Sequence, residues 1–323
     1  MSSKIKVGVM RGGPSSEYDI SLKTGGSVLR NLPEDKYETY DIFISKDGEW
    51  HFRGTPISHP KILTQIDVVF NAMHGQYGED GTVQKILDSF GVPYTGSTAF
   101  ASTVSMNKLL TKQGIESCRI NTPEHIVLDY SKDLKKDILN IFRNFIQPSV
   151  VKPVIGGSSI GVTIAKDFGS LMEGVYKALE YSPRILIEEC INGREVTCGV
   201  IEGFRGEKLY ALMPVEIIPP KKSVFFDYNA KYSGETQEVC PAHLDRVIKE
   251  EIQRIAKEVH RELGLRHYSR SDFIVSPRGI YFLEVNTLPG LTEKSLVPKS
   301  LSAAGSSLPE FLDHLIELAI HGK

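Results

Sequence analysis

Apolar and polar positions in the first part of the chain predict strands that alternate with amphipathic helices. Residues 4–10 alternate between polar and apolar and stop at a glycine turn, after which Ile20, Leu22 and Val28 indicate a helix. Residues 67–73 form an almost continuous apolar run, as in a buried strand, and a helical stripe follows them. Strands that alternate with helices in this way predict an open α/β sheet.

The pattern changes near Ser97, where we place the first domain boundary. The elements expected after it are, in order, a helix that begins at residues 105–110, a strand that ends at 150–153, strands over 184–191 and from 195, an irregular loop over 219–240, and amphipathic helices over 245–263 and 308–319. We therefore expect an N-terminal α/β unit, a central unit and a C-terminal unit, over residues 1–97, 98–188 and 189–323.

Two apolar runs flank Ser-Pro-Arg-Gly at residues 276–279 and predict a β-hairpin. Pro277 is suited to a turn, and Gly279 can take a positive φ. If the loop has three residues, with Gly279 left-handed, Ser276 pairs with Ile280. This register decides which side chains share a face of the hairpin.

The register places Asp272 opposite Glu284, about 5 Å away at Cβ, with Asn286 on the same face. Two carboxylates and an amide oxygen are hard ligands of the kind that Mg²⁺ takes while it keeps sites for water and phosphate. A metal site that handles phosphate is therefore the leading hypothesis. The alternative is a solvated hairpin face. Arg270 on the same face, and the Asn-Thr-Leu-Pro-Gly loop that follows, favour the metal site.

Two glycine-rich loops follow the predicted strands of the N-terminal unit, where ligands of open α/β sheets bind. The first, with Gly12 and Gly13, could hold an anion, and Glu17 beside it could either cap the next helix or bind a ligand's ammonium group. The second begins with His74, which could bind a ligand or only fix the loop. The glycine spacing does not match the dinucleotide fingerprint, so NAD binding is not indicated.

A glycine-serine hairpin, residues 156–162, lies beside Lys152 and could close over phosphate groups. The lysine precedes the glycines, unlike that of a Walker A loop, and a plain surface hairpin would show the same pattern. Glu188, Glu189 and Glu195 lie at a kink between two strands and are candidates for a nucleoside's exocyclic amine and ribose hydroxyls. A solvent-facing charged turn would also explain them.

Composition and charge narrow the possible classes. The chain has 323 residues, of which 41% are hydrophobic and 24% charged, as in a globular protein of two or three domains. Its 38 basic and 40 acidic residues give a net charge of −2 without a basic block, which argues against nucleic acid as a partner. No apolar run suggests a membrane span or a signal peptide, so we expect a cytoplasmic protein with reduced cysteines.

Six motifs, taken in order, resemble the D-alanine–D-alanine ligase family of ATP-grasp enzymes, and the resemblance covers essentially the whole chain. The motifs are Gly12-Gly13 with Glu17, His74-Gly-Gln-Tyr-Gly-Glu-Asp-Gly81, Val151-Lys-Pro with Gly157-Ser-Ser-Ile-Gly-Val162, Asp227-Tyr-Asn-Ala-Lys-Tyr232, Arg270-Ser-Asp272, and Glu284-Val-Asn-Thr-Leu-Pro-Gly290. The resemblance implies a Rossmann-like N-terminal α/β domain followed by a two-lobed ATP-grasp fold, with ATP between the lobes.

The resemblance also implies the reaction. In that family the γ-phosphate of ATP passes to the carboxylate of one D-alanine, and the amine of a second attacks the acyl phosphate. A tetrahedral intermediate then gives D-alanyl-D-alanine, a peptidoglycan precursor, with ADP and phosphate. Two Mg²⁺ ions, which Mn²⁺ could replace, and a homodimer are implied as well.

Residue roles carried over from the family fall into four groups. Those implied to act in catalysis are Glu17, Ser158, Tyr232, Arg270 and Ser295. Those implied to bind the amino acids are Glu17, His74, Lys231, Arg270, Gly290, Ser295 and Leu296. Those implied to bind ATP are Lys108, Lys152, Gly157, Ser158, Ser159, Glu188, Glu189, Ile191, Glu195, Lys231 and Glu284. The metal ligands implied are Asp272, Glu284 and Asn286, the set that the hairpin pattern also predicts.

The sequence departs from the family pattern in a few places. Gly156 stands where the family usually has glutamate, which puts the detailed hydrogen bonding of the phosphate loop in doubt, and Leu291 replaces the common methionine. Tyr232 is kept, whereas relatives that make D-alanyl-D-lactate differ there, and this favours an amine as the second nucleophile. Two alternatives stay open: a ligase for other D-amino or D-hydroxy acids, and an ATP-binding sensor without turnover.

Overall fold

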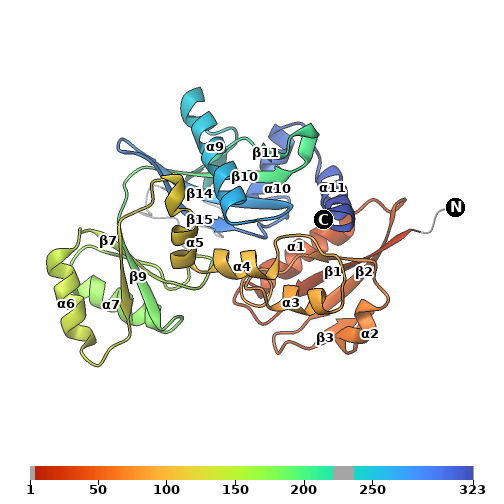
Figure 1. The fold of residues 1–323 in the computed structure, drawn as a ribbon, viewed down its shortest axis with the longest axis horizontal. Helices are drawn as coiled ribbons and strands as arrows, with labels where there is room; N and C mark the ends of the chain where they lie inside the picture. Colours follow the sequence, from red (N-terminus) through yellow and green to blue (C-terminus); the bar gives the residue numbers. More distant parts are fainter. Residues whose placement is uncertain (1–3, 221–235, 323) are drawn as a thin grey trace.

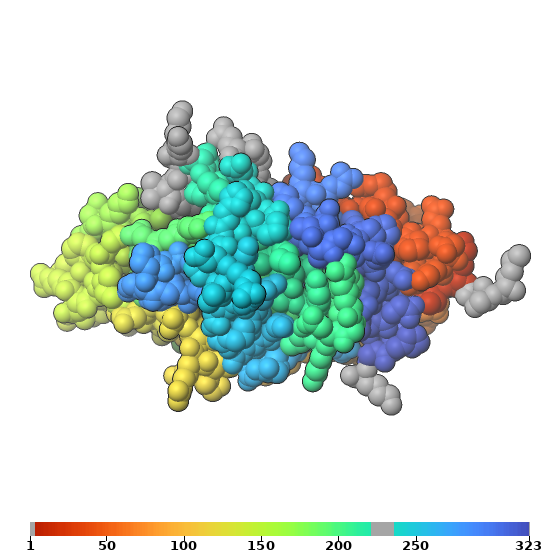
Figure 2. Space-filling view, turned by 90° about the horizontal axis from the view of Figure 1, so that it is seen from above, coloured from red at the N-terminus to blue at the C-terminus, as the bar shows by residue number. Residues whose placement is uncertain are grey.

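The computed structural model of the protein describes residues 4–220 and 236–322, which form three β-sheets with helices packed against them (Figure 1). Each sheet collects its strands from one stretch of sequence. Seen from above in Figure 2, the N-terminal segment (red to orange) lies at one end of the molecule and the segment that holds the second sheet (yellow-green) lies at the other, with C-terminal residues between them.

The first sheet has five strands in the order β4-β3-β2-β1-β5 and is parallel at β2, β1 and β5. Its strands are β1 (Ile5–Gly12), β2 (Tyr37–Ile44), β3 (Trp50–Phe52), β4 (Thr55–Pro56) and β5 (Val68–Asn71), and the helices of this part are α1 (Tyr18–Asn31), α2 (His59–Leu63) and α3 (Thr82–Ser89). Val7 and Val9 of β1 pack with Val28 of α1, whereas Met10 packs with Leu87 of α3. Both faces of β1 are therefore covered, which the alternation of polar and apolar residues over 4–10 did not predict, because alternation is typical of a strand with one exposed face. Because β1 and β5 are parallel neighbours, the glycine-rich loops after them lie at one edge of the sheet.

The second sheet is antiparallel and has the order β6-β9-β7-β8. Its strands are β6 (His125–Asp129), β7 (Ser149–Pro153), β8 (Thr163–Ala165) and β9 (Arg184–Glu189), and it is covered by α6 (Leu134–Asn144) and α7 (Phe168–Leu179). Leu171, Val175 and Ile187 belong to a hydrophobic core of its own. The glycine-serine hairpin predicted beside Lys152 is confirmed, because it joins the antiparallel strands β7 and β8.

The third sheet has the order β13-β12-β10-β14-β15, with β11 paired to β10. Its strands are β10 (Arg194–Glu202), β11 (Leu209–Ala211), β12 (Val215–Ile218), β13 (Gln237–Val239), β14 (Tyr268–Ser276) and β15 (Gly279–Asn286), and α9 (Arg246–Glu262) covers one face. The predicted end of this helix is confirmed: Gly264 follows the C-cap residue Leu263 and has a φ of +61°. Within the loop expected over 219–240, the described residues include the short strand β13.

Two short helices, α4 (Ala99–Met106) and α5 (Lys108–Gly114), connect the first sheet to the others. The predicted helix start within residues 105–110 is confirmed, because α5 begins at Lys108, but the separate helix α4 before Asn107 was not predicted. Asn107 Oδ1 accepts hydrogen bonds from the N–H groups of Leu109 and Leu110, each 3.1 Å away, and so caps α5. Ala101 of α4 packs into the core of the third sheet. The domain limits at residues 97 and 188 stay predictions.

The last two helices, α10 (Leu296–Ala303) and α11 (Leu308–His321), belong to a core that joins the two ends of the chain. Phe311 and Ile316 of α11 are fully buried with Val7 and Phe70 of the first sheet and with Tyr268 of the third. The rings of Tyr268 and Phe311 meet edge to face with centroids 5.5 Å apart. The first and third sheets therefore share one hydrophobic core.

The β14–β15 hairpin has the predicted pairing at its functional end but a different turn. Ser276 pairs with Gly279, not with Ile280, so the three-residue loop is wrong and the loop has two residues. The register then shifts between Asp272 and Phe273, and this bulge restores the predicted pair of Asp272 and Glu284. The expected positive φ of Gly279 is confirmed at +129°.

None of the helices within residues 4–220 and 236–322 has the length and apolar character needed to cross a membrane. The four cysteines, all in the described part of the chain, are free thiols, as expected.

Candidate active site

Two neighbouring cavities hold the predicted site residues. The larger, of 710 Å³, extends from the glycine-rich loops of the first sheet to the start of α10, and the smaller, of 400 Å³, lies between the second and third sheets. Lys108, Gly156, Gly157 and Glu284 line both. A ligand in the smaller cavity could therefore reach a second ligand in the larger one at this junction.

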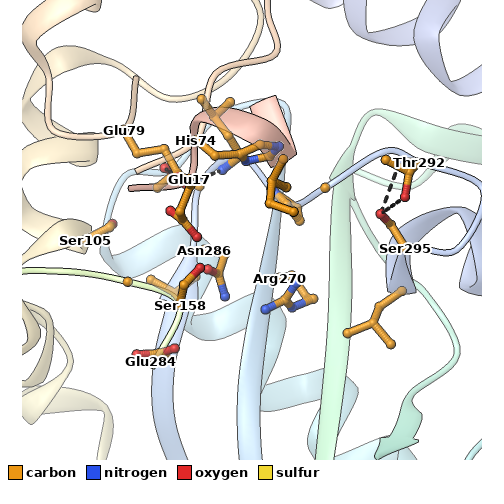
Figure 3. A pocket seen from close by; sticks show the side chains of 18 of the residues that line it. Glu17, His74, Glu79, Ser105, Ser158, Arg270, Glu284, Asn286, Thr292 and Ser295 are labelled. Atoms are coloured by element: carbon orange, nitrogen blue, oxygen red, sulfur yellow. Dashed lines mark hydrogen bonds between the residues drawn. The ribbon is translucent and has the colours of Figure 1, made fainter. Parts of the chain in front are cut away.

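Asp272 on β14 is the centre of a polar cluster. Its Oδ1 accepts hydrogen bonds from Arg270 Nε (3.0 Å) and from Thr197 Oγ1 (2.6 Å). Its Oδ2 accepts from Arg270 Nη2 (2.9 Å) and Asn286 Nδ2 (3.1 Å). Burial by itself lowers the pKa of the Arg270 guanidinium, but the charge and hydrogen bonds of Asp272 hold this pKa above its ordinary value. Arg270 is therefore a fixed cation that also lines the larger cavity, as Figure 3 shows.

The hairpin residues suit a magnesium ion by their chemistry. Asp272 and Glu284 are cross-strand partners, and Asn286 contacts Asp272, so two carboxylates and an amide share one face. Within the described residues, no three His, Cys, Asp or Glu side chains gather to hold an ion by themselves. Mg²⁺ does not need such a cage, because it keeps several waters and binds substrate phosphates. Asn286 donates from its Nδ2 to Asp272 Oδ2, so its Oδ1 is the atom that would coordinate an ion.

Lys108 carries positive charge to the junction of the cavities. It is the first residue of α5, and its Nζ donates to the carbonyl oxygen of Gly156 at 2.6 Å and lies 3.5 Å from Glu284 Oε2. Burial lowers the pKa of Lys108, and the negative charge of Glu284 offsets only part of this shift. A lysine held in this way, beside a carboxylate and the glycine-serine loop, can meet a phosphate that binds between them.

Glu188 on β9 is held between two buried lysines at the smaller cavity. Lys152 Nζ contacts its Oε2, and Lys112 Nζ lies 2.9 Å from its Oε1. Burial by itself would raise the pKa of this carboxyl, but Lys152 and Lys112 more than offset it and hold the pKa below its ordinary value. The cavity thus presents an ionised acceptor deep in the protein.

The loop between β7 and β8 has an unusual backbone. Ser158 and Ser159 have φ values of +50° and +56°, and Gly156 has +135°. Non-glycine residues rarely adopt positive φ, and each such residue costs on the order of 1 kcal/mol. Strain of this kind concentrates at ligand clamps, so the loop geometry is consistent with the predicted phosphate contacts.

Glu17 points from the start of α1 toward the larger cavity (Figure 3). It is the N-cap residue, but its side chain makes no capping hydrogen bond, so of the two sequence interpretations the ligand contact is favoured. Gly75 lies against it: a Cβ there would be 2.7 Å from Glu17 Oε2, and its φ is +70°. The glycine loops therefore leave room for this carboxylate.

Glu79, which the sequence reasoning did not single out, is buried near Glu17. Its oxygens accept hydrogen bonds from the N–H groups of Gly75 (2.7 Å) and Leu288 (3.0 Å). Burial and the charge of Glu17 raise its pKa to about 7. Through its hydrogen bonds from Gly75 and Leu288, Glu79 connects the first sheet to the loop after β15. Its only sequence signal is its place inside the motif that begins at His74.

His74 lines the larger cavity and has a partner within the protein. Its Nε2 lies 2.8 Å from Thr24 Oγ1 of α1. Burial lowers its pKa to about 4, so the ring is neutral near pH 7. Both sequence interpretations are compatible with this position.

The start of α10 forms the far end of the larger cavity. Ser295 is the N-cap residue, but its Oγ accepts from the N–H of Thr292 (3.1 Å) and not from the helix. Gly290 approaches it closely, since a Cβ there would be 3.0 Å from Ser295 Oγ. Leu296 is the first residue of the helix and is almost fully buried. The N–H groups of Leu296 and Val297 in the first turn can receive an anion, whereas Pro298 has no N–H to donate.

Glu189, Ile191 and Glu195 line the smaller cavity together with Glu188. Glu189 is held on both sides, by Arg278 Nη2 at 2.7 Å from Oε2 and by the N–H of Glu124 at 3.3 Å from Oε1. Its own N–H donates to the carbonyl of Glu124. A ligand contact through its backbone would therefore use the carbonyl oxygen.

Every predicted site residue that the structure describes thus lines one of the two cavities, although the role of each stays a prediction. Lys231 and Tyr232 lie outside the described residues. Lys112 is missing from the predicted set, because nothing in its local sequence marks a contact with β9.

Family models match most of the chain. The model described as "D-ala D-ala ligase N-terminus" matches residues 6–58 and 51–97, and the model described as "D-ala D-ala ligase C-terminus" matches residues 115–317. A D-alanine–D-alanine ligase from Syntrophobacter fumaroxidans is 38% identical over 320 residues, which cover 99% of this chain and 99% of that protein.

Solved structures agree over the whole length. A D-alanine–D-alanine ligase from Bacillus anthracis, complexed with ATP, is 33% identical with a TM-score of 0.81 and covers 98% of this chain and 97% of that one. The VanG D-Ala:D-Ser ligase from Enterococcus faecalis is 30% identical with a TM-score of 0.85 and covers 98% and 100%. The predicted fold class, an α/β N-terminal domain followed by a two-lobed ATP-grasp fold, is confirmed.

Proposed function

The chain belongs to the D-alanine–D-alanine ligase family, and on this premise we propose how its two cavities join two D-alanine molecules. The protein is an enzyme that uses ATP to form D-alanyl-D-alanine through an acyl phosphate. The observation that supports the residue assignment is the junction at Lys108 and Glu284, because this one lysine and this one carboxylate line both cavities.

ATP lies with its adenosine in the smaller cavity and its phosphates at the junction. Glu188 accepts a hydrogen bond from the base, with Glu189, Ile191 and Glu195 around the nucleoside. Lys108 and Lys152 supply positive charge along the phosphates, and Gly157, Ser158 and Ser159 donate from the loop. This arrangement points the γ-phosphate into the larger cavity.

Asp272, Glu284 and Asn286 would hold Mg²⁺ at the same junction, with two ions expected and Mn²⁺ as a substitute. When bound, the ions supply charge neutralisation to the terminal phosphates. The protein's own part is to fix the ligands: hydrogen bonds from Thr197 and Arg270 hold the Asp272 carboxylate in place.

The amino acids occupy the larger cavity. Glu17 binds the ammonium of the first D-alanine and directs its carboxylate toward the γ-phosphate. The second D-alanine places its carboxylate at the start of α10, beside Ser295 and Leu296, and its amine attacks the acyl phosphate. Arg270, with the N–H of Gly290, then stabilises the oxyanion of the tetrahedral intermediate. His74 completes the wall next to the first amino acid.

The family roles of Lys231 and Tyr232, near the second amino acid, stay predictions. We also propose a homodimer, which rests on the resemblance alone, and a cytoplasmic location, which the use of ATP as substrate implies. Light scattering of the purified protein should give twice the chain mass of 35.9 kDa. A mass equal to that of one chain would contradict the dimer.

An assay with ATP, Mg²⁺ and D-alanine tests the proposed function. We expect release of phosphate and D-alanyl-D-alanine with D-alanine and none with L-alanine. D-Serine and D-lactate, offered as second substrates beside D-alanine, should react more slowly. Phosphate release only with another acid would replace the substrate assignment, and ATP binding without release under all conditions would support the sensor.

A further inference from the structure

Helix α5 carries two buried lysines one turn apart that reach opposite ends of the nucleotide site. Lys108 and Lys112 are four residues apart and so share a face of the helix. Lys108 points to Glu284 at the phosphate end. Lys112 instead points to Glu188 at the base end, and its Nζ also donates to the carbonyl of Pro123 at 3.2 Å. One short helix therefore carries a lysine to each end of the proposed nucleotide site.

Neutralising Glu188 does not by itself explain Lys112. The side chains of Lys112 and Glu188 are only 5% and 2% exposed, and Lys152 already pairs with the other oxygen of the same carboxylate. Burying a second ammonium group costs free energy, which a lone ion pair recovers only partly. What the second lysine adds is direction. Its Nζ lies 2.9 Å from Oε1 as an ion pair, yet Oε1 accepts no hydrogen bond from the described residues, so this oxygen is held in place and still has an acceptor position for a ligand. Oε2 is held by Lys152 on another element of the fold.

The cavity around Glu188 suits a purine base that carries an amino group. Ile164, Ile274 and Leu283 give it apolar walls for a flat ring. An ionised carboxylate only accepts hydrogen bonds, and with four lone-pair positions it can accept one from a ligand while it contacts two lysines. A base with a hydrogen atom in place of the amino group would leave that acceptor without its partner.

We propose that Lys112 is a positioning residue that fixes Glu188 as the acceptor for the 6-amino group of adenine. Through Glu188 it sets the preference of the enzyme for ATP over purine nucleotides that lack this group. The inference rests on the proposed function, which places the base in the smaller cavity. Lys112 does not itself touch the nucleotide.

The effect is confined to binding of the base. Glu188 without Lys112 keeps its ion pair with Lys152 but can turn about its side-chain bonds, so the hydrogen bond to the amino group loses its fixed geometry. The base is remote from the reacting atoms, so this loss raises the KM for ATP and leaves kcat almost unchanged.

The test compares ATP with purine riboside triphosphate, in which hydrogen replaces the 6-amino group, in the D-alanine-dependent reaction. For Lys112→Met we expect the KM for ATP to rise about tenfold, the lower end of the effect of a hydrogen bond to a charged group, because the bond is loosened and not removed. The KM for the analogue should stay within about twofold of the wild-type value, because it never made that contact. Lys136→Met, the same change on the exposed face of α6, is the matched control and should alter neither.

Two further variants keep the test decisive. Lys112→Gln keeps a donor for Pro123 and removes the charge, and it serves if Lys112→Met does not fold. In the Glu188→Gln background, Lys112→Gln should add no further loss for ATP. Equal losses for ATP and the analogue, or full additivity of the two changes, would overturn the proposal.

If the wild-type enzyme does not use ATP with D-alanine, the proposed function itself fails. If it does but shows no preference for ATP over the analogue, only this inference fails.

Discussion

Replacing Arg270 with alanine tests the centre of the proposed mechanism. The guanidinium lies at the edge of the larger cavity, and both of its hydrogen bonds to Asp272 come from one side of the fork. The remaining N–H groups are thus available to an oxyanion formed between the two amino acids. If they serve that role, the lost interaction exists only in the transition state and the intermediate.

The expected size follows from these contacts. Loss of one oxyanion donor costs about 10²–10³ in kcat, or about 2.7–4 kcal/mol. Removing one partner of a buried ion pair can also lower the free energy of unfolding by about 3–5 kcal/mol. We expect less here, because Asp272 keeps hydrogen bonds from Thr197 Oγ1 (2.6 Å) and Asn286 Nδ2 (3.1 Å). The variant should therefore fold.

Steady-state kinetics with D-alanine varied at saturating ATP, together with thermal unfolding, measure both effects. The control is Thr197→Val, which removes a hydrogen bond to Asp272 from a buried residue that lines neither cavity. It should lower kcat far less than Arg270→Ala, so that an effect passed on through Asp272 can be recognised. An Arg270→Ala enzyme with unchanged kcat and only a higher KM for D-alanine would refute the oxyanion role.

Three further predictions test other parts of the site. Glu284→Gln should lower kcat by about 10–100-fold or more, because changes to residues around metal ligands already have effects of this size. It should also raise the Mg²⁺ concentration that gives the half-maximal rate. A magnesium titration that matches the wild type would rule out the metal assignment. Because burial and Glu17 raise the pKa of Glu79 from 4.5 to about 7, the folded protein keeps a proton there that the unfolded chain releases, so stability falls as pH rises through this window. Glu79→Gln lacks that loss, and its free energy of unfolding relative to wild type should increase by up to about 3 kcal/mol between pH 4.5 and 8, as denaturant titrations would show; a constant difference would mean that Glu79 does not titrate there. Gly75→Ala should raise the KM for D-alanine by pushing Glu17 aside, whereas Gly54→Ala, with a φ of +79° and nothing within 4 Å of the new methyl, should not; equal effects on KM would indicate backbone strain alone.

The hairpin shows what the sequence can predict and where it stops. The face shared by Asp272 and Glu284 follows from strand alternation, and the structure has this pair. The turn was predicted with one residue too many, because a bulge elsewhere in the hairpin leaves no mark in the alternation of apolar and polar residues. The two differences cancel at the functional end.

Helix α4 was missed for a local reason. Its sequence, Ala-Phe-Ala-Ser-Thr-Val-Ser-Met, mixes small and polar residues without an apolar stripe, and burial of Ala101 against the third sheet holds it in place. Lys112 and Glu79 were missed because their partners lie far away in the sequence. The motifs predicted residues that line the two cavities, but only the three-dimensional structure shows which charged side chains within them form ion pairs.

The shared core around α11 has a consequence for the way this protein is made. Val7 and Phe70 emerge from the ribosome early, but Phe311 and Ile316, which cover them, are translated near the end of the chain. Until then α1 alone packs on this face of the first sheet, and the apolar side chains that α11 later buries stay exposed to water. The core of the first sheet is therefore completed only after the third sheet has been made, and a product that lacks α11 should require chaperones or precipitate, even with every ligand-contacting residue intact.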